Sequence, residues 1–495
     1  MKRKIPDTKA YEKIVGTFKK HKNGITLADV AAGTGLGLNQ VKTLVPLAAD
    51  EYCARLEVTE SGEILYSFPR GFKSRYRGAG PALKKFLSSS GRFAVCMGIL
   101  LFKAWIMVML LGYFLLFIAI ALASILLSVA ASRNRRGGGG AHLFMVFFNM
   151  MIRLWFYSEL LNAGRRGNSG WQQQRSAGDK KNPLHRAIFS FVFGDEDPNR
   201  DHGSLMRKEF ISYLRKRRGV VSLPELMVLT GQNPENAESL ITGLCAEFGG
   251  SPEVTEEGTI VYRFDEILLS GEKKNSTPTG AAFVSGPVAP LYKKPRVFSS
   301  NPGKMNFWFG IINSVNLLFG SYFMFNALSV GRIFSLEALQ GAGLYGQVYY
   351  FLIMSGIDAL PVIQIGLGLV PLLFSALFWL IPALRLWLLK KENDAIRLGN
   401  FRGFFYSRIW TSPEGFKPAG NEPRSEECRP RNFSSAGNLA LKEMGRYSIP
   451  EVSVDEKQNE VFDFRELRRE KDALEKYRAS VEPKAQTGET VFDSA

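Results

Sequence analysis

The chain has 495 residues, of which 46% are hydrophobic and 22% charged, and a formal net charge of +17. This length suffices for three or four compact units. The positive charge first suggests a nucleic-acid ligand, but residues 25–68 hold two basic and six acidic side chains, and residues 221–264 one basic and seven acidic. Four widely spaced cysteines argue against a disulfide-built secreted domain, and the absence of a secretory signal predicts a cytoplasmic N-terminus.

Two polar stretches of the chain repeat each other. Residues 57–68 read EVTESGEILYSF and residues 253–264 read EVTEEGTIVYRF, so eight of twelve positions are identical at an offset of 196. The match extends upstream without a gap, and a membrane-type apolar block separates the copies. We call residues 8–70 the first module and residues 204–267 the second module.

Each module is predicted to contain three helices followed by a hairpin. In the first module, apolar residues at helical spacing in 11–20 predict the first helix. Thr26, with Asp29 three residues later, matches a capping box at the start of a short second helix. Residues 39–49 form a third, and period-two alternation at the end predicts a β-hairpin. The second module repeats this order.

This order of elements resembles the winged-helix family, a variant of the helix-turn-helix, over about 60 residues in each copy. The resemblance rests on element order, since no family-specific motif is present. It implies an α+β fold in which two winged-helix-like domains accompany an all-α polytopic membrane region. Because many winged-helix domains bind DNA, it also implies a membrane-tethered DNA-binding regulator as one hypothesis.

The expected DNA-reading surfaces are too acidic for a duplex. DNA binding needs Lys and Arg against phosphates, and side chains that reach base edges. The third helix of the second module offers Glu235 and Glu238 instead. Acidic residues also occupy the expected wings: Glu57, Glu60, Glu63, Glu253, Glu256 and Glu257. Nucleic acid is therefore disfavoured as a partner.

A basic tetrad follows the first helix of each module. The tetrads are Lys19, Lys20, His21 and Lys22 in the first module, and Arg215, Lys216, Arg217 and Arg218 in the second. A cation at a helix C-terminus contributes about 0.3–1 kcal/mol, but four at equivalent sites exceed that need. The tetrads are expected to contact either anionic lipid head groups or the acidic wing of the other module. We favour the wing contact.

Four stretches are apolar enough to be membrane segments. They are residues 94–130, 142–161, 305–330 and 348–389. Residues 69–92 carry seven Lys or Arg and no acid, and basic residues also flank the later segments. Because basic residues favour the inner side of a membrane, the N-terminus, both modules and the C-terminus are predicted to be cytoplasmic, on an inner or cytoplasmic membrane.

The front membrane region, residues 93–161, has two topologies that keep both modules on one side. The preferred one is a helical hairpin of 105–130 with 142–161. The alternative folds 94–130 into a tight two-pass hairpin and lays 142–161 along the inner interface. Both rest on the need for an even number of crossings.

The rear membrane region, residues 305–389, is predicted to be a second helical hairpin with 331–346 as its outer loop. Its segments contain polar side chains that hydrocarbon disfavours. These are Asn306, Asn313, Asn316, Asp358 and Gln364. Interhelical hydrogen bonding is the simplest explanation, and a polar pathway for an ion or small solute is the alternative.

Residues 271–304, rich in Gly, Pro, Ser and Lys, are predicted to be a flexible linker. The tail, residues 391–495, is predicted to be cytoplasmic and largely disordered, with little order between 413 and 460. A short charged helix is expected at 463–482, and the aromatic residues of 404–410 are expected at the membrane interface.

No pattern predicts catalysis, a metal or a cofactor: the four histidines are isolated, and no GxxxxGK loop occurs. The sequence therefore predicts a non-enzymatic integral membrane protein that acts as a scaffold or adaptor. Its expected partners are membrane lipids and a protein, and a homo-oligomer is compatible with it. Two alternatives stay open: a transporter or channel component regulated by its soluble modules, and the DNA-binding regulator.

Overall fold

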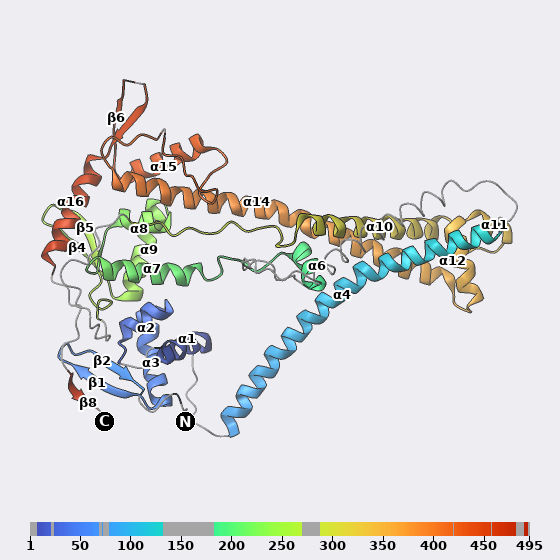
Figure 1. Cartoon of the computed structure of the whole chain (residues 1–495), viewed down its shortest axis with the longest axis horizontal. Coiled ribbons are helices and arrows are strands. Elements are labelled where there is room, and N and C mark those ends of the chain that lie inside the picture. The colour runs from blue at the N-terminus through green and yellow to red at the C-terminus, as the bar shows by residue number, and fades with distance from the viewer. Residues whose placement is uncertain are drawn as a thin grey trace, which may run out of the picture. The chain divides into compact units, whose positions relative to one another are not determined.

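The structure, a computed structural model, divides into two compact units (Figure 1). One contains both helices and strands, and the described elements of the other are helices. It describes residues 7–20, 24–68, 72, 79–131, 183–269, 288–418, 420–456, 458–481 and 490–493. The modular unit consists of residues 1–89, 196–296 and 388–495, and the helical unit of residues 90–195 and 297–387.

The first module has the predicted three helices and hairpin. Its elements are α1 (Thr8–Lys20), α2 (Leu27–Thr34), α3 (Leu38–Tyr52), β1 (Arg55–Thr59) and β2 (Ile64–Ser67). The expected capping box starts α2, because Asp29 N donates to Thr26 Oγ1 at 3.1 Å and Thr26 N donates to Asp29 Oδ2 at 3.4 Å. Gly35 ends α2 with a φ of +70°, which glycine adopts without strain.

The second module repeats this backbone position by position. Its elements are α7 (His202–Lys216), β3 (Val220–Val221), α8 (Leu223–Thr230), α9 (Pro234–Phe248), β4 (Ser251–Val254) and β5 (Ile260–Arg263). Gly231 ends α8 with a φ of +65°, at the place of Gly35 in the first module. The bridge between Val221 and Tyr262 likewise takes the place of the bridge between Ile25 and Tyr66.

The C-terminal segment is ordered, which corrects the expectation of a largely disordered tail at 391–495. Its elements are the end of α14 (Val370–Thr411), then α15 (Phe433–Tyr447), β6 (Glu451–Val454), β7 (Glu460–Asp463), α16 (Arg465–Ser480) and β8 (Thr490–Asp493). The stretch 413–460 is polar on average. Its few apolar residues, however, fall where they meet the core, as Phe416, Ala440 and Met444 do. α16 lies within the range 463–482 that was expected to be helical.

One contiguous apolar cluster joins both modules and the C-terminal segment. Fully buried members come from each part: Phe18, Val41, Phe210, Phe264, Phe405 and Phe464. The placement of the aromatic residues of 404–410 at the membrane interface is wrong for Phe405, Tyr406 and Trp410, which are at most 5% exposed within this cluster. The modular unit therefore has a single core built from three distant stretches of chain.

The described half of the predicted linker 271–304 is held in place. Residues 288–302 lack helix and strand, but Lys293 N and Lys293 O both bond the Asn400 side chain, at 2.9 and 2.7 Å. Arg296 bonds Asn393 in the same way, with its N–H and its carbonyl both at 2.8 Å. These paired bonds fix the strand-like chain along α14, so it is not a flexible tether there.

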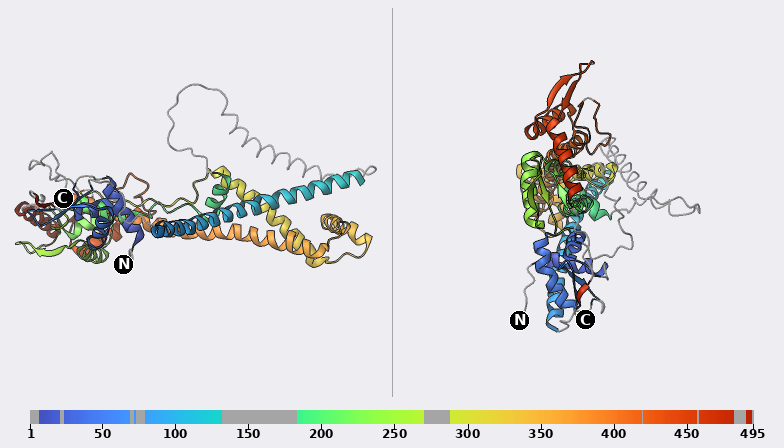
Figure 2. Two further views of the ribbon diagram at one scale, coloured as in Figure 1. Left: turned by 90° about the horizontal axis from the view of Figure 1, so that it is seen from below. Right: turned by 90° about the vertical axis from the view of Figure 1, so that its left-hand side faces the viewer.

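The helical unit contains the membrane-type helices. Its elements are α4 (Ala79–Ala131, in part), α6 (Leu184–Phe193), α10 (Gly303–Ser329), α11 (Leu336–Gly341), α12 (Gly343–Met354), α13 (Ala359–Pro361), the π-helix η1 (Val362–Leu369) and the start of α14. Among the described residues, three helices are long and apolar enough to cross a membrane: Met97–Leu126, Gly303–Ser329 and Ala359–Thr411. In Figure 2 α4, α10 and α14 come together, and they share buried apolar clusters.

Two topological expectations change. The tight two-pass hairpin proposed for 94–130 is wrong, because α4 runs through this range without a turn. The predicted segment 142–161 lies outside the described residues. The fourth segment, 348–389, is not one helix, because the chain breaks between α12 and α13, where Gly356 has a φ of +75°. The expected outer loop 331–346 contains α11 and the start of α12.

Small residues let α10 approach the η1–α14 helix closely. A Cβ on Gly320 would lie 3.1 Å from Leu372 N, and one on Gly368 would lie 3.1 Å from Met324 Cα. The two contacts are reciprocal, since each glycine faces the backbone of the other helix. Close backbone approach of this kind is how membrane helices gain van der Waals contact.

We expect Gly320→Leu to destabilise the helical unit by about 1–3 kcal/mol, because the added side chain overpacks a backbone contact. Gly98→Leu is the matched control, since Gly98 is exposed on α4 with no atom within 4 Å of its Cβ position. Thermal melting of both variants in detergent measures the effect. Equal melting temperatures for the two variants would show that α10 and α14 do not meet at Gly320.

Candidate functional site

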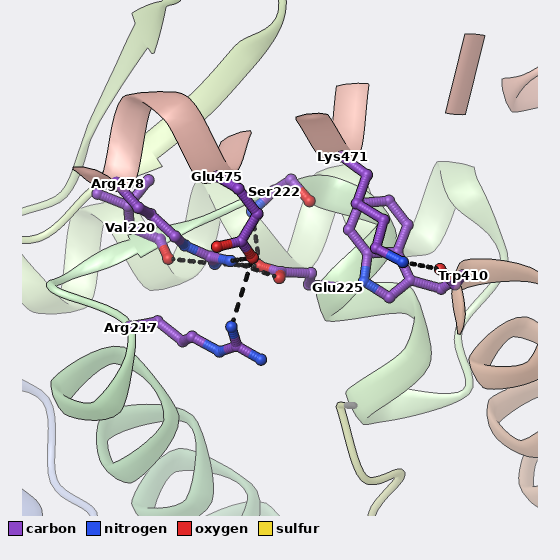
Figure 3. A network of polar contacts seen from close by, with 8 residues as sticks. All are labelled: Arg217, Val220, Ser222, Glu225, Trp410, Lys471, Glu475 and Arg478. Carbon is purple, nitrogen blue, oxygen red and sulfur yellow. Dashed lines mark hydrogen bonds and ion pairs between the residues drawn. The ribbon is translucent and has the colours of Figure 1, made fainter. Parts of the chain in front are cut away.

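The most buried charges of the modular unit form an ion pair between the second module and α16. Arg478 Nη1 lies 2.9 Å from Glu225 Oε1, and Arg478 Nη2 lies 2.6 Å from Glu225 Oε2. The side chains are 5% and 2% exposed. Arg478 Nη2 also donates to Val220 O at 2.8 Å, and Nη1 contacts Glu475 at 3.2 Å (Figure 3).

The local sequence explains why a carboxylate is at this point. Glu225 occupies the third position of α8, where an acid reaches back to the N-cap, and its Oε2 accepts from Ser222 N at 3.3 Å. The N-terminus of a helix also favours negative charge. Because a buried charge needs a partner, Glu225 requires a cation, and only an arginine can match both of its oxygens with two parallel donors.

The second basic tetrad contacts α16 and the first module. Arg217 Nη1 lies 3.4 Å from Glu475 Oε1. Arg218 Nη1 donates to Arg478 O at 2.9 Å and to Ala479 O and Val481 O, both at 3.2 Å, at the C-terminal end of α16. Arg215 Nη2 lies 2.9 Å from Asp29 Oδ1. Lys216 is exposed.

The acidic wing of the second module is also bound by α16. Lys476 Nζ lies 3.0 Å from Glu257 Oε1, and the Tyr477 hydroxyl donates to Glu253. The hydrogen bond from Lys476 lowers the pKa of Glu257. Glu256 is exposed. Among the described residues, the favoured contact between a tetrad and the wing of the other module does not occur. Instead, α16 contacts both the tetrad and the wing of the second module.

The acids of the first wing have separate surroundings. Glu57 lies 3.6 Å from Arg55 of its own strand, and Glu60 is exposed. Burial raises the pKa of Glu63, the nearby Glu266 raises it further, and Lys42 opposes the change. In the first tetrad Lys19 and Lys20 are exposed at the end of α1, and Lys22 lies outside the described residues.

Polar residues of the first module bind the second module. Asn39 Nδ2 donates to Ala246 O at 3.1 Å, and Lys42 Nζ lies 2.7 Å from Glu266 Oε2. Thr26 Oγ1 donates at 2.9 Å to Leu269 O, just after the second module. Asn39 and Lys42 lie on α3, the third helix, with which a winged-helix domain would read DNA. The contact with the second module therefore uses that surface.

The second module contacts the C-terminal segment through the equivalent face. A Cβ on Gly35 would lie 2.5 Å from Ser204 O of α7, and one on Gly231 would lie 2.2 Å from Gly399 O of α14. Both glycines end the second helix of their module. The same turn therefore packs on the first helix of the next part of the chain in each case, and Arg446 of α15 adds an exposed ion pair with Glu235 at 3.0 Å.

One polar clasp between a first and a third helix occurs three times. The Tyr11 hydroxyl donates to Glu51 Oε2 at 2.6 Å in the first module. Arg207 Nε donates to Glu247 Oε2 at 2.7 Å in the second. In the C-terminal segment Arg402 Nε donates to Glu443 Oε2, also at 2.7 Å, between α14 and α15. Each of these third helices precedes a hairpin. Glu51 and Glu247 are the next-to-last residues of α3 and α9, whereas Glu443 lies about one turn earlier in α15.

The three hairpins share one turn geometry. Thr59 N donates to Glu63 O, Thr255 N to Thr259 O and Asp455 N to Asn459 O, at 2.9–3.0 Å. Each turn contains one residue with positive φ: Gly62, Gly258 and Gln458. The bridge between Phe416 and Phe462 matches the one that joins Val221 to Tyr262. The missed sequence signal is the spacing of Val454, Phe462 and Phe464, which repeats the spacing of Val254, Tyr262 and Phe264.

The structure separates the five polar residues of the predicted membrane site. Asn313 Nδ2 donates to Ser375 O at 3.0 Å, and Asn316 Nδ2 donates to Leu110 O at 2.8 Å, so both bond a neighbouring helix. The other three lie elsewhere: Asn306 accepts from Asn301, Asp358 is exposed and 3.0 Å from Arg332, and Gln364 is partly buried in η1. Asp358 therefore lies before α13 and outside any helix, contrary to its expected place inside the fourth segment.

Comparison with known proteins finds one uncharacterised chloroplastic protein of Arabidopsis thaliana to which this chain is similar. The two are 24% identical over 413 residues, which is 79% of this chain and 70% of that protein. The similarity therefore extends well beyond a single module. No protein-family model matches the chain, and no solved structure matches it.

We expect Arg478→Ala to lower the free energy of unfolding by about 3–5 kcal/mol, because it leaves the Glu225 carboxylate buried and unpaired. Arg446→Ala is the matched control, since it breaks an Arg–Glu pair between the same two parts whose side chains are 58% and 71% exposed. That variant should lose less than about 1 kcal/mol. Chemical denaturation in detergent measures both, and similar losses would contradict the buried position of Arg478.

Stability should also fall as pH rises through the pKa of Glu470. Burial raises the pKa of this α16 carboxyl to about 7, against the lowering effect of the hydrogen bond from the Tyr447 hydroxyl at 2.9 Å. The folded state therefore holds a proton that the unfolded state has lost, and the resulting stability is full below pH ~4.5 and is lost as pH rises to about 7.

The slope of this change is at most about 1.4 kcal/mol per pH unit. Glu470→Gln should then melt higher than the wild type at pH ~8 and close to it at pH ~5. Glu466→Gln, an exposed position on the same helix, serves as the control. A Glu470→Gln shift that is the same at both pH values would show that the carboxyl does not titrate in this window.

Proposed function

We propose that this protein is a non-enzymatic, membrane-anchored scaffold whose modular unit presents three stacked winged-helix-like modules to a protein partner. The third module would be the C-terminal segment from the end of α14 to β7. The threefold clasp and the shared hairpin turn support this assignment. Between Phe416 and Phe433 turns replace the second helix, as suits a terminal repeat that caps a stack.

The observation that carries the proposal is that the third helices of the first two modules contact other parts of the same chain. Asn39 and Lys42 of α3 bond the second module, and Glu235 of α9 pairs with Arg446. A winged-helix domain that reads DNA needs this helix free to enter the major groove. Stacking therefore supports protein binding over the DNA-binding regulator.

The membrane side of the proposal rests on the three apolar helices and their basic flanks. Positive flanks favour one side of the bilayer, and we place the N-terminus, all three modules and the C-terminus on that side, the cytoplasmic one. A transporter is less well supported, because Asp358 pairs with Arg332 while Asn313 and Asn316 bond helix backbones.

Photo-crosslinking in native membranes tests the proposal. A crosslinking amino acid at Glu60 or Val254, both exposed on wings, should give discrete adducts with another protein. The matched control is the same amino acid at Asn39, which contacts the second module and should crosslink only within the chain. Nuclease treatment should leave the wing adducts unchanged.

Two results would contradict the scaffold. One is a nucleic-acid adduct, or retention of the full-length detergent-solubilised protein on duplex DNA at physiological salt. The other is solute flux in proteoliposomes that is lost with Asp358→Asn, which would favour the transporter instead.

A further inference from the structure

The outer edge of the first wing already carries an added strand. β8 pairs antiparallel with β1 on the side away from β2, which gives the sheet order β2-β1-β8. Glu57 lies opposite Asp493, and Val58 lies opposite Phe492. The site is thus a sheet edge that takes a short extended segment from elsewhere in the sequence.

One side-chain contact fixes the register of this strand. Arg55 Nε donates to Asp493 Oδ1 at 2.7 Å, and Arg55 Nη2 bonds the second oxygen of the same carboxylate. A bidentate arginine–carboxylate contact adds direction as well as energy. The edge therefore selects a strand with a carboxylate at this position.

The equivalent edge of the second module is closed. In the first wing Thr59 N donates to Glu63 O, so the N–H of Thr59 points toward β2. Because N–H groups alternate in direction along a strand, those of Leu56 and Val58 point to the outer edge. In β4 the place of Leu56 is taken by Pro252, which has no N–H to offer an added strand. Proline at this point is a known protection of a sheet edge.

β8 is held weakly in comparison with α16. It is only four residues long, its register shifts between Val58 and Thr59, and Val491 and Phe492 stay 68% and 62% exposed. A strand that buries so little apolar surface gains little from the hydrophobic effect. It is therefore readily displaced by a competing strand.

We propose that the β1 edge is a docking site for an extended segment of a protein partner, with two apolar residues followed by an acidic one, and that β8 is its internal competitor. Strand addition of this type draws affinity from main-chain hydrogen bonds and specificity from side chains such as Arg55. The inference rests on the proposed scaffold and names the chemistry of its partner.

The test measures binding of a fluorescent peptide with the sequence of residues 489–495, ETVFDSA, to the full-length protein in detergent. Deletion of 489–495 leaves α16 intact and should tighten peptide binding about tenfold or more, because the tethered strand no longer competes at its high effective concentration. Adding Arg55→Ala to the deletion should weaken binding several-fold. Arg263→Ala in the second wing is the control and should change nothing.

A charge exchange between protein and peptide separates a lost contact from a misfolded variant. Arg55→Asp in the deleted chain should bind a peptide with Asp493→Arg better than it binds the native peptide. The proposal is overturned if the deleted chain does not bind the peptide, or if intact and deleted chains bind it equally. The intact protein could also form a dimer that is lost on deletion of 489–495. That result would assign the edge to β8 of a second copy and overturn the proposal of a partner protein. Because the assay uses no partner protein and no DNA, its failure leaves the scaffold proposal standing.

Discussion

The ion pair between Glu225 and Arg478 is the interaction on which the modular unit most depends. Both charges are almost fully out of water, and each bonds the other and backbone groups of the second module, while the buried Nε of Arg478 has no partner. Two desolvated charges are tolerated only when they face each other with good geometry, as the bidentate contact does here. The pair therefore requires α16 to dock in one position, and the C-terminal segment, separated from the second module by a membrane region, is fixed against it.

The same position has the same role in the first module. Asp29 corresponds to Glu225. It forms a salt bridge with Arg215 of the second module, as Glu225 does with Arg478 of α16. In each module the acid that caps the second helix is neutralised by an arginine from the next part of the chain. Part of the basic complement of the chain therefore lies in contacts between its parts, where it neutralises these capping acids. This arrangement also joins the parts head to tail, with Gly35 and Gly231 at equivalent close contacts.

The sequence predicted those features that depend on local chemistry. The capping acids, the Gly turns and the alternation of the hairpins all lie close together in the chain, so the element order of the first two modules and the apolar character of α4 and α10 followed from pattern alone. The break before α13 was missed because Gly356 is one small residue inside a long apolar run. The residues that α16 contacts in the second module were not predicted, because they are more than 200 residues distant in the sequence.

The resemblance of the C-terminal segment to the modules was hidden for a physical reason. Its hairpin uses Gln458 where the others use glycine for the positive φ, and its second helix is replaced by turns. Its average polarity then suggested disorder, although a few apolar side chains at the right spacing are enough to join a core that the other modules already supply. Mean composition is a poor guide for a segment that folds on a preformed surface.

Hydrogen exchange of backbone amides tests the central claim, that three distant segments fold as one stacked unit, most directly. The account predicts that the amides of Asp455 and Phe464, bonded to Asn459 O and Pro413 O, are protected about as strongly as those of Thr255 and Phe264 in the second module. Fast exchange across 413–464 beside a protected second module would contradict it, and would show a tail that does not belong to the core.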